Sequence, residues 1–479
     1  MPSTRFIHGY GFLWLSLALL IVLSLSFLLP LTPQDYWWYL RVGEETLAGG
    51  AVPSVDRYSY TLAGTPLVYP AWLAAVLLWL CYAGGGLPAT FLMRGLLLGG
   101  AYGLFWYSLR RVSGPRLATV LTIILVLSSS SNWSIRPQMF AIPLFVGSLF
   151  IFYAWHERDS RLVWMLPLIS LLWANIHSSF ALIFILGGSG FIFGKGNRKA
   201  LGAALSLSIL TAMINPVGYS IWATVLDAGS IRSISTEWLP PLNSGWQMNI
   251  FYAWLLLFIP LAVLSPKKLD LLNWLWFVGL GWLALSGVRF VIWFQFLLAF
   301  QTAFLLSDWD LRWLDRRGRR GIAAINFSLA ALFLFLPLFL LPGIRDGWWP
   351  EAPALMEDTP VAAVEWLKAQ PEAPIKMWND FNFSSYLIFA LPEHPVRIDT
   401  RMHLVGYTPQ QYDQYRAIAS ARYDWQTMLM DENINLLFLS NANQPALVQA
   451  VERSGEWCIA YRDEIATIGL LRQPNQLCP

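Results

Sequence analysis

Charged residues are scarce in this chain of 479 residues: they make up 13% of it, whereas hydrophobic residues make up 56%. Soluble domains carry about 25% charged residues, so this composition excludes an ordinary soluble enzyme. The mean hydropathy of +0.49 agrees with that conclusion. The formal net charge is only +3, which argues against nucleic-acid binding, because that function needs a concentrated basic face. We therefore expect a polytopic membrane protein.

Cysteine is also rare. Its three residues, Cys81, Cys458 and Cys478, have a spacing that matches neither a metal site nor a redox motif. Cys458 and Cys478 can pair if the C-terminal region faces an oxidising compartment, but sequence alone does not establish a disulfide. Tryptophan, in contrast, occurs 26 times, as is typical of side chains that anchor a protein at the membrane interface.

Apolar runs follow one another along the first two thirds of the chain, and we assign eleven membrane-spanning helices to them. Several are near the lower length limit for crossing about 30 Å of hydrocarbon. The first run follows a basic residue, as a signal peptide does, but it lacks a small-residue cleavage site, so we expect a retained helix. The runs cover residues 10–31, 87–109, 117–132, 138–155, 162–176, 178–194, 200–214, 249–265, 270–287, 290–307 and 321–342.

Lysine and arginine cluster in alternate connections between these runs, which the positive-inside rule assigns to the cytoplasm. The N-terminus is then cytoplasmic, and the loop 32–86, the connection 215–248 and everything after residue 343 lie outside. A further apolar run at 68–83 breaks this alternation if it crosses, so we expect it on or in the outer leaflet. The location predicted is the bacterial cytoplasmic membrane. The clusters are Arg110, Arg111 and Arg116; Arg158 and Arg161; Lys195, Arg198 and Lys199; Lys267 and Lys268; and Arg312, Arg316, Arg317, Arg319 and Arg320.

The C-terminal region changes character, with more charge, more proline and shorter apolar runs. Alternating strands and helices predict a small α/β domain at 343–479, next to a transmembrane domain at 1–342 that includes the loop 32–86. The fold class is thus an all-α polytopic membrane protein with a small extracytoplasmic α/β domain. Helices are expected at Thr359–Gln370, Phe383–Leu391 and Pro445–Ser454, and strands at Pro374–Trp378, Val396–Asp399, Ile434–Ser440 and Ile465–Leu471.

A carboxylate stands among aromatic residues at the start of the first loop. Asp35 follows Leu31, the end of the first run, by four residues, and Trp37, Trp38 and Tyr39 come next. A carboxylate at the hydrocarbon boundary is a candidate functional group. The same pattern also fits an interfacial aromatic belt beside an aspartate that caps the following helix.

Further carboxylates occur later in the same loop. Asp56 is the second candidate, and Glu44 and Glu45 are weaker ones. Because Asp56 follows Pro53 closely, it is equally well explained as a turn residue.

Motifs spread over nearly the whole chain resemble those of the GT-C membrane glycosyltransferases. These include protein mannosyltransferases, the aminoarabinose transferase of lipid A and oligosaccharyltransferases. They share a first transmembrane helix, a long external loop with an early aspartate and an arginine-rich cytoplasmic turn. A group of bacterial GT-C-like proteins is more similar still, through Asp35, Trp37, Trp38, Leu40, Gly43, Pro53, Asp56, Ser59, Tyr60, Thr61, Trp72 and Leu73, and through Arg136–Gln138, Trp173–His177, Asn215–Tyr219, Glu237–Pro240 and Ile398–Arg401.

The resemblance implies transfer of a sugar from a polyprenyl-phosphate donor to an extracytoplasmic lipid, glycan or protein. Such transfer needs a base for the acceptor's proton and cations for the leaving phosphate. Asp35 is the candidate base, and Asp56 either orients the acceptor or shares a cation with it. A guanidinium suits phosphate because its donors form a planar fork. Arg94 within a span, Arg136 at an outer helix start and Arg289 between two helices are therefore candidates for binding the donor phosphate.

Other residues are candidates for binding sugar, and each has a structural alternative. A lone histidine is more often a satisfied structural residue, and Glu237 with Trp238 also fits an interfacial loop anchor. Arg94 either points into the protein or snorkels to the interface. A pair such as Asp399 and Arg401 is more typical of an ion pair at a strand end. The sugar-binding candidates are Trp37, Trp38, Glu44, His177, Glu237 and Trp238.

The chain departs from the family pattern at several positions. Tyr39 stands where histidine is frequent, and Ser178 and Ser179 stand where glycine follows the histidine at 177. The segment 128–136 lacks the carboxylates that metal-dependent oligosaccharyltransferases carry there, so the resemblance gives no support for a bound divalent metal. The expected partners are the bilayer, the lipid-linked donor and the acceptor, without nucleic acid.

Two functions of other classes remain as alternatives. A transporter or flippase for lipid-linked saccharides needs polar groups and broken helices near the membrane midplane, whereas this chain keeps most charges near the ends of its apolar runs. In a non-catalytic assembly protein for envelope polysaccharides, the loop carboxylates are dispensable.

Overall fold

The structure is a computed structural model that describes residues 10–159, 161–227, 236–309, 322–370, 375–422 and 424–472. It divides into two compact units. The first consists of Met1–Leu29 and Cys81–Ala352, and the second of Pro30–Leu80 and Pro353–Pro479. Most of the loop 32–86 thus packs with the C-terminal region. The basic residues at 312–320 and Cys478 lie outside the described residues. The predictions made for them therefore stay predictions.

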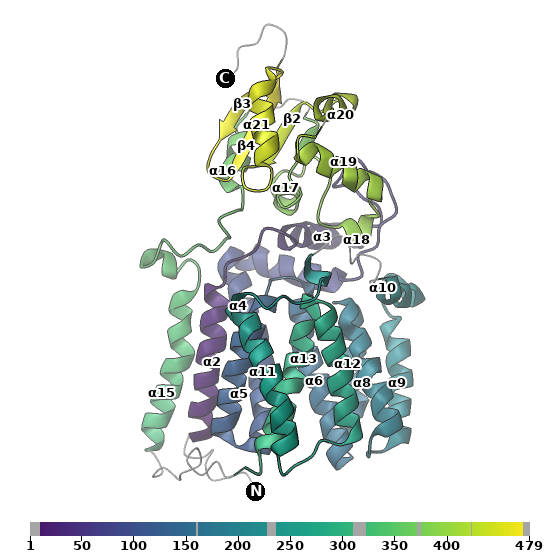
Figure 1. The fold of residues 1–479 in the computed structure, drawn as a ribbon, viewed down its shortest axis with the longest axis vertical. Helices are drawn as coiled ribbons and strands as arrows, with labels where there is room; N and C mark the ends of the chain where they lie inside the picture. Colours follow the sequence, from purple (N-terminus) through teal and green to yellow (C-terminus); the bar gives the residue numbers. More distant parts are fainter. Residues whose placement is uncertain are drawn as a thin grey trace. The chain divides into compact units, whose positions relative to one another are not determined.

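The first unit is a bundle of helices whose long members run side by side (Figure 1). Each of the eleven apolar runs contains a helix. The helices are α2 (Tyr10–Leu28), α4 (Trp72–Ser113), α5 (Pro115–Ser129), α6 (Pro137–Arg158), α7 (Leu166–Ala174), α8 (Leu182–Phe193), α9 (Arg198–Ala212), α10 (Ile221–Asp227), α11 (Gly245–Leu264), α12 (Leu271–Ser286), α13 (Val291–Leu306) and α15 (Ala323–Phe335). The first residues of α4, up to Leu80, belong to the second unit. Short 3-10 helices are η1 (Ser130–Asn132), η2 (Arg161–Met165), η3 (Ser178–Ala181), η4 (Gly218–Ser220), η5 (Thr236–Trp238), η6 (Val288–Phe290), η7 (Leu336–Leu340) and η8 (Arg345–Gly347).

Six helical segments among the described residues are long and apolar enough to cross a membrane: α2, α4, α6, α11, η6 with α13, and α15 with η7. Three shorter apolar stretches lie at Arg161–Ala174, Ser178–Phe193 and Leu271–Ser286. A helix of about 16 residues is only about 24 Å long, less than the roughly 30 Å of hydrocarbon. The count of eleven crossings therefore stays a prediction.

Helix α4 is two helices joined at a kink. Gly85 and Gly86 leave helical geometry, and Gly86 has φ 62° and ψ −148°, a conformation that glycine adopts without a steric penalty. Pro88 then lies near the start of the second helix, where its missing N–H costs little. The kink separates the apolar run at 68–83 from the span that follows it, and whether the first part enters the membrane stays a prediction.

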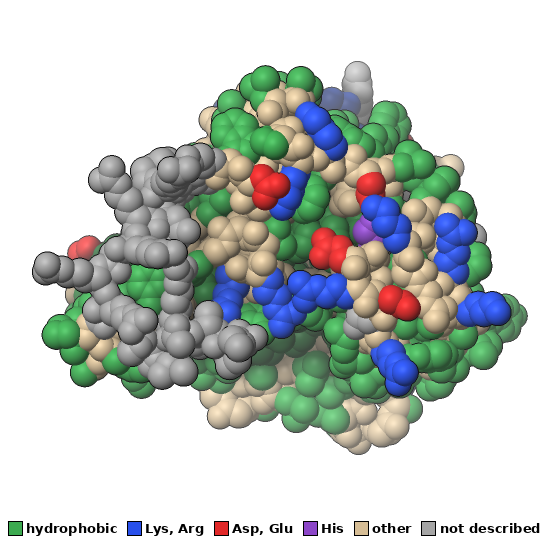
Figure 2. All heavy atoms as spheres, turned by 90° about the horizontal axis from the view of Figure 1, so that it is seen from below, with side chains coloured by type: hydrophobic (Ala, Val, Ile, Leu, Met, Phe, Trp, Pro, Cys, Tyr) green, Lys and Arg blue, Asp and Glu red, His purple; other side chains and the backbone are tan. Residues whose placement is uncertain are grey.

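Basic residues collect at one end of the bundle. Arg110 and Arg111 lie in the last turn of α4, and Arg158 ends α6. Successive helices alternate in direction, which brings these helix ends to one face. Figure 2 shows this face, with lysine and arginine side chains spread over it and acidic side chains between them. The grouping fits the charge pattern that the positive-inside rule uses.

The second unit contains a four-stranded sheet of order β1-β2-β4-β3, in which β1 and β2 are parallel and the other neighbours antiparallel. All five residues of β2 are buried, so this strand lies in the core of the unit. The strands are β1 (Met377–Asn379), β2 (Leu436–Ser440), β3 (Trp457–Arg462) and β4 (Ala466–Leu471). The helices are α3 (Tyr36–Gly49), α16 (Val361–Lys368), α17 (Ser384–Ala390), α18 (Met402–Val405), α19 (Pro409–Ala419), α20 (Trp425–Asp431) and α21 (Pro445–Ser454).

The expected α/β pattern is largely confirmed, with one wrong strand. The segment Val396–Asp399 is not part of the sheet. The backbone of Val396 instead forms hydrogen bonds with the loop 32–86. The Val396 N–H donates to the Tyr58 carbonyl at 2.9 Å, and the Tyr60 N–H donates to the Val396 carbonyl at 3.1 Å. Sequence analysis also missed β3.

Candidate functional site

Asp35 stands at the N-cap position of α3, but its side chain accepts no hydrogen bond from the first turn of the helix. The indole N–H of Trp38 instead donates to Asp35 Oδ1 at 3.3 Å. The carboxylate is partly exposed. The capping alternative therefore does not account for this aspartate, and the contact with Trp38 orients its carboxylate.

Trp37 and Trp38 pack α3 against α17. Trp38 is fully buried, and its backbone N–H donates to Ser385 Oγ at 3.1 Å. Trp37 contacts the rings of Tyr386 and Phe389, with centroids 5.0 and 5.2 Å away. These are contacts of core residues, and a role of either indole in binding sugar stays a prediction. Glu44, also on α3, forms an ion pair of 2.8 Å with Arg41, and sugar binding by Glu44 likewise stays a prediction.

Asp56 belongs to a buried ion network. Arg401 donates from Nη1 to Asp56 Oδ1 at 2.8 Å and from Nη2 to Asp399 Oδ2 at 2.6 Å, and all three side chains are fully buried. Tyr69 and Ser59 complete the network, because the Tyr69 hydroxyl accepts from Arg401 and the Ser59 hydroxyl donates to Asp56 Oδ2 at 2.6 Å. Asp56 thus holds the loop to the C-terminal region within the second unit.

The network keeps Arg401 charged. Burial lowers the pKa of a guanidinium, but the neighbouring carboxylates of Asp399 and Asp56 outweigh it and raise the pKa of Arg401 well above its usual value. The expected ion pair between Asp399 and Arg401 is present. Its partner Asp56, 345 residues away in sequence, was not identified from the sequence.

Four of the candidate residues meet in the first unit. Arg136 lies just before α6, and its Nη1 forms an ion pair of 2.7 Å with Glu237 Oε1 of η5. Arg289 of η6 lies over the ring of Trp238, with its Cζ 4.3 Å from the centroid. We call Arg136, Glu237, Trp238 and Arg289 the arginine cluster. It contains two guanidinium groups and one carboxylate, so it carries one positive charge in excess.

Backbone contacts hold the three segments of the arginine cluster together. The side-chain amide of Gln138 donates to the Arg289 carbonyl at 2.9 Å. The Val288 N–H donates to the Leu239 carbonyl at 3.0 Å, and the ring of Phe290 meets Trp238 edge-on at 5.7 Å. Gln138 lies in one of the motifs recognised from the sequence, but its structural role was not predicted.

His177 begins η3 as its N-cap. Its Nδ1 accepts from the Ser179 N–H at 3.1 Å and lies 2.7 Å from Ser179 Oγ. Ser179, a departure from the family pattern, therefore supplies two contacts to this ring nitrogen. These contacts support the structural alternative, and sugar binding by His177 stays a prediction.

Arg94 points into the protein and does not snorkel to the interface, which were the two alternatives from the sequence. It is 1% exposed, and its Nη2 donates to the Leu29 carbonyl at 2.5 Å. Its Cζ lies 4.4 Å from the centroid of the Phe91 ring. Among the described residues it shares no hydrogen bond or ion pair with the arginine cluster.

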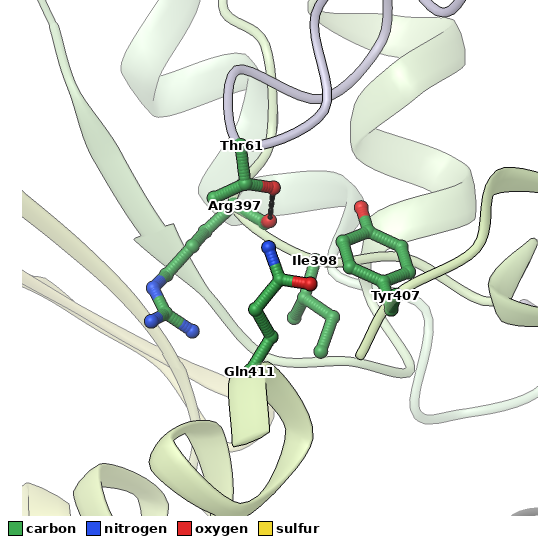
Figure 3. Close-up of a pocket in the computed structure, with 5 residues that line it drawn as sticks. All are labelled: Thr61, Arg397, Ile398, Tyr407 and Gln411. Atoms are coloured by element: carbon green, nitrogen blue, oxygen red, sulfur yellow. Dashed lines mark hydrogen bonds between the residues drawn. The ribbon is translucent and has the colours of Figure 1, made fainter. Parts of the chain in front are cut away.

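One pocket among the described residues of the second unit is small. Figure 3 shows Thr61, Arg397, Ile398, Tyr407 and Gln411 around it, with the Arg397 guanidinium directed away from Tyr407. The Thr61 hydroxyl donates to the Arg397 carbonyl at 2.6 Å, and Glu432 binds the guanidinium. The pocket has room for about one water molecule, which is too little for a sugar. Nowhere in the described ranges do three His, Cys, Asp or Glu side chains gather as a metal site requires.

A buried acid in the second unit gives a testable pH dependence. Asp380 is 1% exposed, and burial raises its pKa to about 6 although the Asn382 and Phe383 N–H groups stabilise the ionised form. The folded state therefore binds this proton more tightly than the unfolded state, and stability falls as pH rises from about 4 to 6.

We expect Asp380→Asn to remove this loss and to raise the free energy of unfolding at pH 7 by about 3 kcal/mol. The measurement is the melting temperature of the full chain in detergent, for both proteins, at several pH values from 4 to 7. A difference between the two proteins that does not change with pH would contradict the prediction.

The amino-acid sequence matches no protein-family model and no curated protein, whereas the structure resembles solved membrane enzymes. For the oligosaccharyltransferase of Archaeoglobus fulgidus tethered to an acceptor peptide, the TM-score is 0.62 at 12% identity, over 98% of this chain and 75% of that chain. For ArnT from Cupriavidus metallidurans bound to undecaprenyl phosphate, it is 0.52 at 12% identity, over 98% of both chains. For the arabinofuranosyltransferase AftD from Mycobacteria, it is 0.52 at 14% identity, over 95% of this chain and 41% of that chain.

All three are glycosyltransferases of the GT-C superfamily, which confirms the resemblance noted from the motifs. The identities are too low to carry residue roles or substrates from one protein to another. Both the helical bundle and the small C-terminal sheet fall within the matched region, because the match covers nearly the whole chain. The chain has the fold of the GT-C membrane glycosyltransferases.

Proposed function

We propose that this protein is a membrane glycosyltransferase that moves a sugar from a polyprenyl-phosphate-linked donor to an extracytoplasmic lipid, glycan or protein. The observation that carries the proposal is the environment of Asp35. Its partly exposed carboxylate stands at the N-cap position of α3 but accepts no hydrogen bond from the backbone of the first turn. It accepts one from the Trp38 indole N–H instead. The fold supports it, since ArnT is solved with undecaprenyl phosphate and the archaeal oligosaccharyltransferase with dolichol-phosphate. The proposal includes a location in the bacterial cytoplasmic membrane, with the N-terminus inside and the C-terminal region outside, as the charge pattern of the sequence predicts.

In the proposed reaction, Asp35 accepts the proton of the acceptor group as that group attacks the anomeric carbon of the sugar. The bond between this carbon and the phosphate oxygen breaks, and negative charge grows on the leaving phosphate. Fixed positive charge stabilises such a transition state. Arg136 and Arg289 of the first unit stay the candidates for binding the donor phosphate, because a guanidinium offers a planar fork of donors. Asp56 takes no direct part, since Arg401 already binds it in the core.

The test is a comparison of envelope glycans and lipid-linked sugars in a deletion strain and in the same strain carrying the wild-type gene. We expect the deletion to remove one glycan modification and to let its lipid-linked donor accumulate on the extracytoplasmic side. Accumulation of the donor on the cytoplasmic side would instead favour a flippase. Unchanged modification, with altered amounts of assembled polysaccharide, would favour a non-catalytic assembly protein.

A further inference from the structure

Two buried arginines of the first unit meet at the C-terminal end of α2. Arg345 of η8 donates from Nη1 to the Phe27 carbonyl at 2.8 Å. Arg94 of α4 donates to the Leu29 carbonyl, as described above. Both side chains are almost completely buried, at 0% and 1% exposure. They come from segments some 250 residues apart in the sequence, so the tertiary fold alone creates the pair.

Among the described residues, protein groups balance the positive charge of Arg94 only in part. The two guanidinium groups are near enough to repel each other. Asp346 attracts Arg345 and also accepts from the Gly343 N–H at 2.8 Å. Arg94 has no carboxylate partner among the described residues. The end of a helix offers only about half a negative charge, so about half of the positive charge of Arg94 remains.

Arg94 also keeps an unused donor. Its Nε is buried and has no hydrogen-bond partner. A buried donor without an acceptor is destabilising, and a buried charge without a counter-charge more so. An anion beside Arg94 removes both penalties. Phosphate is the anion that membranes supply in quantity, and a guanidinium fork binds it through parallel hydrogen bonds.

The surroundings favour a lipid over a free anion. α2 and α15 lie at the edge of the bundle, because only 33% and 17% of their membrane-spanning stretches are buried. Beside Arg345, the exposed residues Ile344, Trp348 and Trp349 form an apolar and aromatic surface. Tryptophan is typical of the depth at which lipid head groups lie. We propose that Arg94 and Arg345 form a binding site for the phosphate group of a membrane lipid, separate from the arginine cluster.

This proposal does not depend on the glycosyltransferase activity, and it is tested by binding. The full chain is purified in detergent, stripped of lipid and examined by native mass spectrometry with one added probe at a time. The probes are phosphatidylglycerol, undecaprenyl phosphate, inorganic phosphate and diacylglycerol, which has no phosphate. The variant is Arg94→Gln, and Arg161→Gln is the matched control, because Arg161 is exposed.

We expect the wild type and Arg161→Gln to retain one equivalent of a phosphate-bearing lipid, and Arg94→Gln to bind it at least ten-fold more weakly. Binding of phosphatidylglycerol supports a general phospholipid, and binding of undecaprenyl phosphate alone identifies the carrier lipid as the ligand. Equal binding of diacylglycerol or of inorganic phosphate would overturn the proposal, and so would unchanged lipid binding by Arg94→Gln. If Arg94→Gln does not fold, Arg94→Lys keeps the charge but loses the fork. Undiminished retention by that variant would then overturn the proposal.

Discussion

Replacing Arg401 with alanine is expected to unfold the second unit of the protein. The guanidinium forms ion pairs with Asp56 and Asp399, and all three side chains are fully buried. Alanine leaves two carboxylates close together in the core with no cation. Removing one partner of a buried ion pair typically costs about 3–5 kcal/mol, a large share of the roughly 5–15 kcal/mol that stabilises a domain.

The measurement is chemical unfolding of the full chain in detergent, together with limited proteolysis of the C-terminal region. Arg462→Ala is the matched control, because Arg462 forms an exposed ion pair with Glu452, and such pairs contribute about 1 kcal/mol or less. A combined replacement of Arg401 by Met and of both aspartates by Asn should recover much of the stability, since it removes the unpaired charges. Equal unfolding curves for Arg401→Ala and Arg462→Ala would contradict the prediction.

Asp35→Asn is expected to reduce sugar transfer by a factor of about 10²–10⁴, the usual contribution of a positioned base. Asparagine has nearly the same size and still offers Oδ1 to the Trp38 indole N–H. Stability should change little, because the side chain is partly exposed and accepts no hydrogen bond from the backbone N–H groups of the helix it precedes. The variant therefore separates the chemistry of the carboxylate from its packing.

The amount of the glycan is measured in the deletion strain carrying each variant, with the abundance of the protein in membranes measured in parallel. Glu365→Gln is the control, since Glu365 is exposed and pairs with Lys368 at the surface of α16. We expect Glu365→Gln to restore the glycan fully. A full glycan level with Asp35→Asn at normal abundance would show that Asp35 is not the base.

Secondary structure was predictable where the signal is local. The run at 445–454 reads as a helix because its apolar residues recur at helical spacing, and α21 has these same bounds. β2 and β4 were found because they are continuous apolar runs between turn residues. The segment Val396–Asp399 alternates apolar and charged residues, as a strand does. It is nevertheless not a strand of the sheet, because its backbone partners, Tyr58 and Tyr60, lie in a distant loop. No local pattern carries that information.

For the candidate site, the sequence likewise indicated individual residues but not the contacts between them. The residues of the arginine cluster were each chosen from the sequence, but nothing in it indicated that Arg136 pairs with Glu237 or that Arg289 lies over Trp238. Asp56 was taken as a possible catalytic group, and only its burial beside Arg401 indicates a structural role.

The sequence by itself determined the apolar helices, the small C-terminal α/β pattern and the residue types available for chemistry, because these depend on composition and on spacing along the chain. The tertiary structure decided which side chains meet and which carboxylates are buried. It also decided that the loop after α2 packs with a region more than 300 residues later. Those outcomes depend on contacts between distant segments, whose free energies no local pattern records.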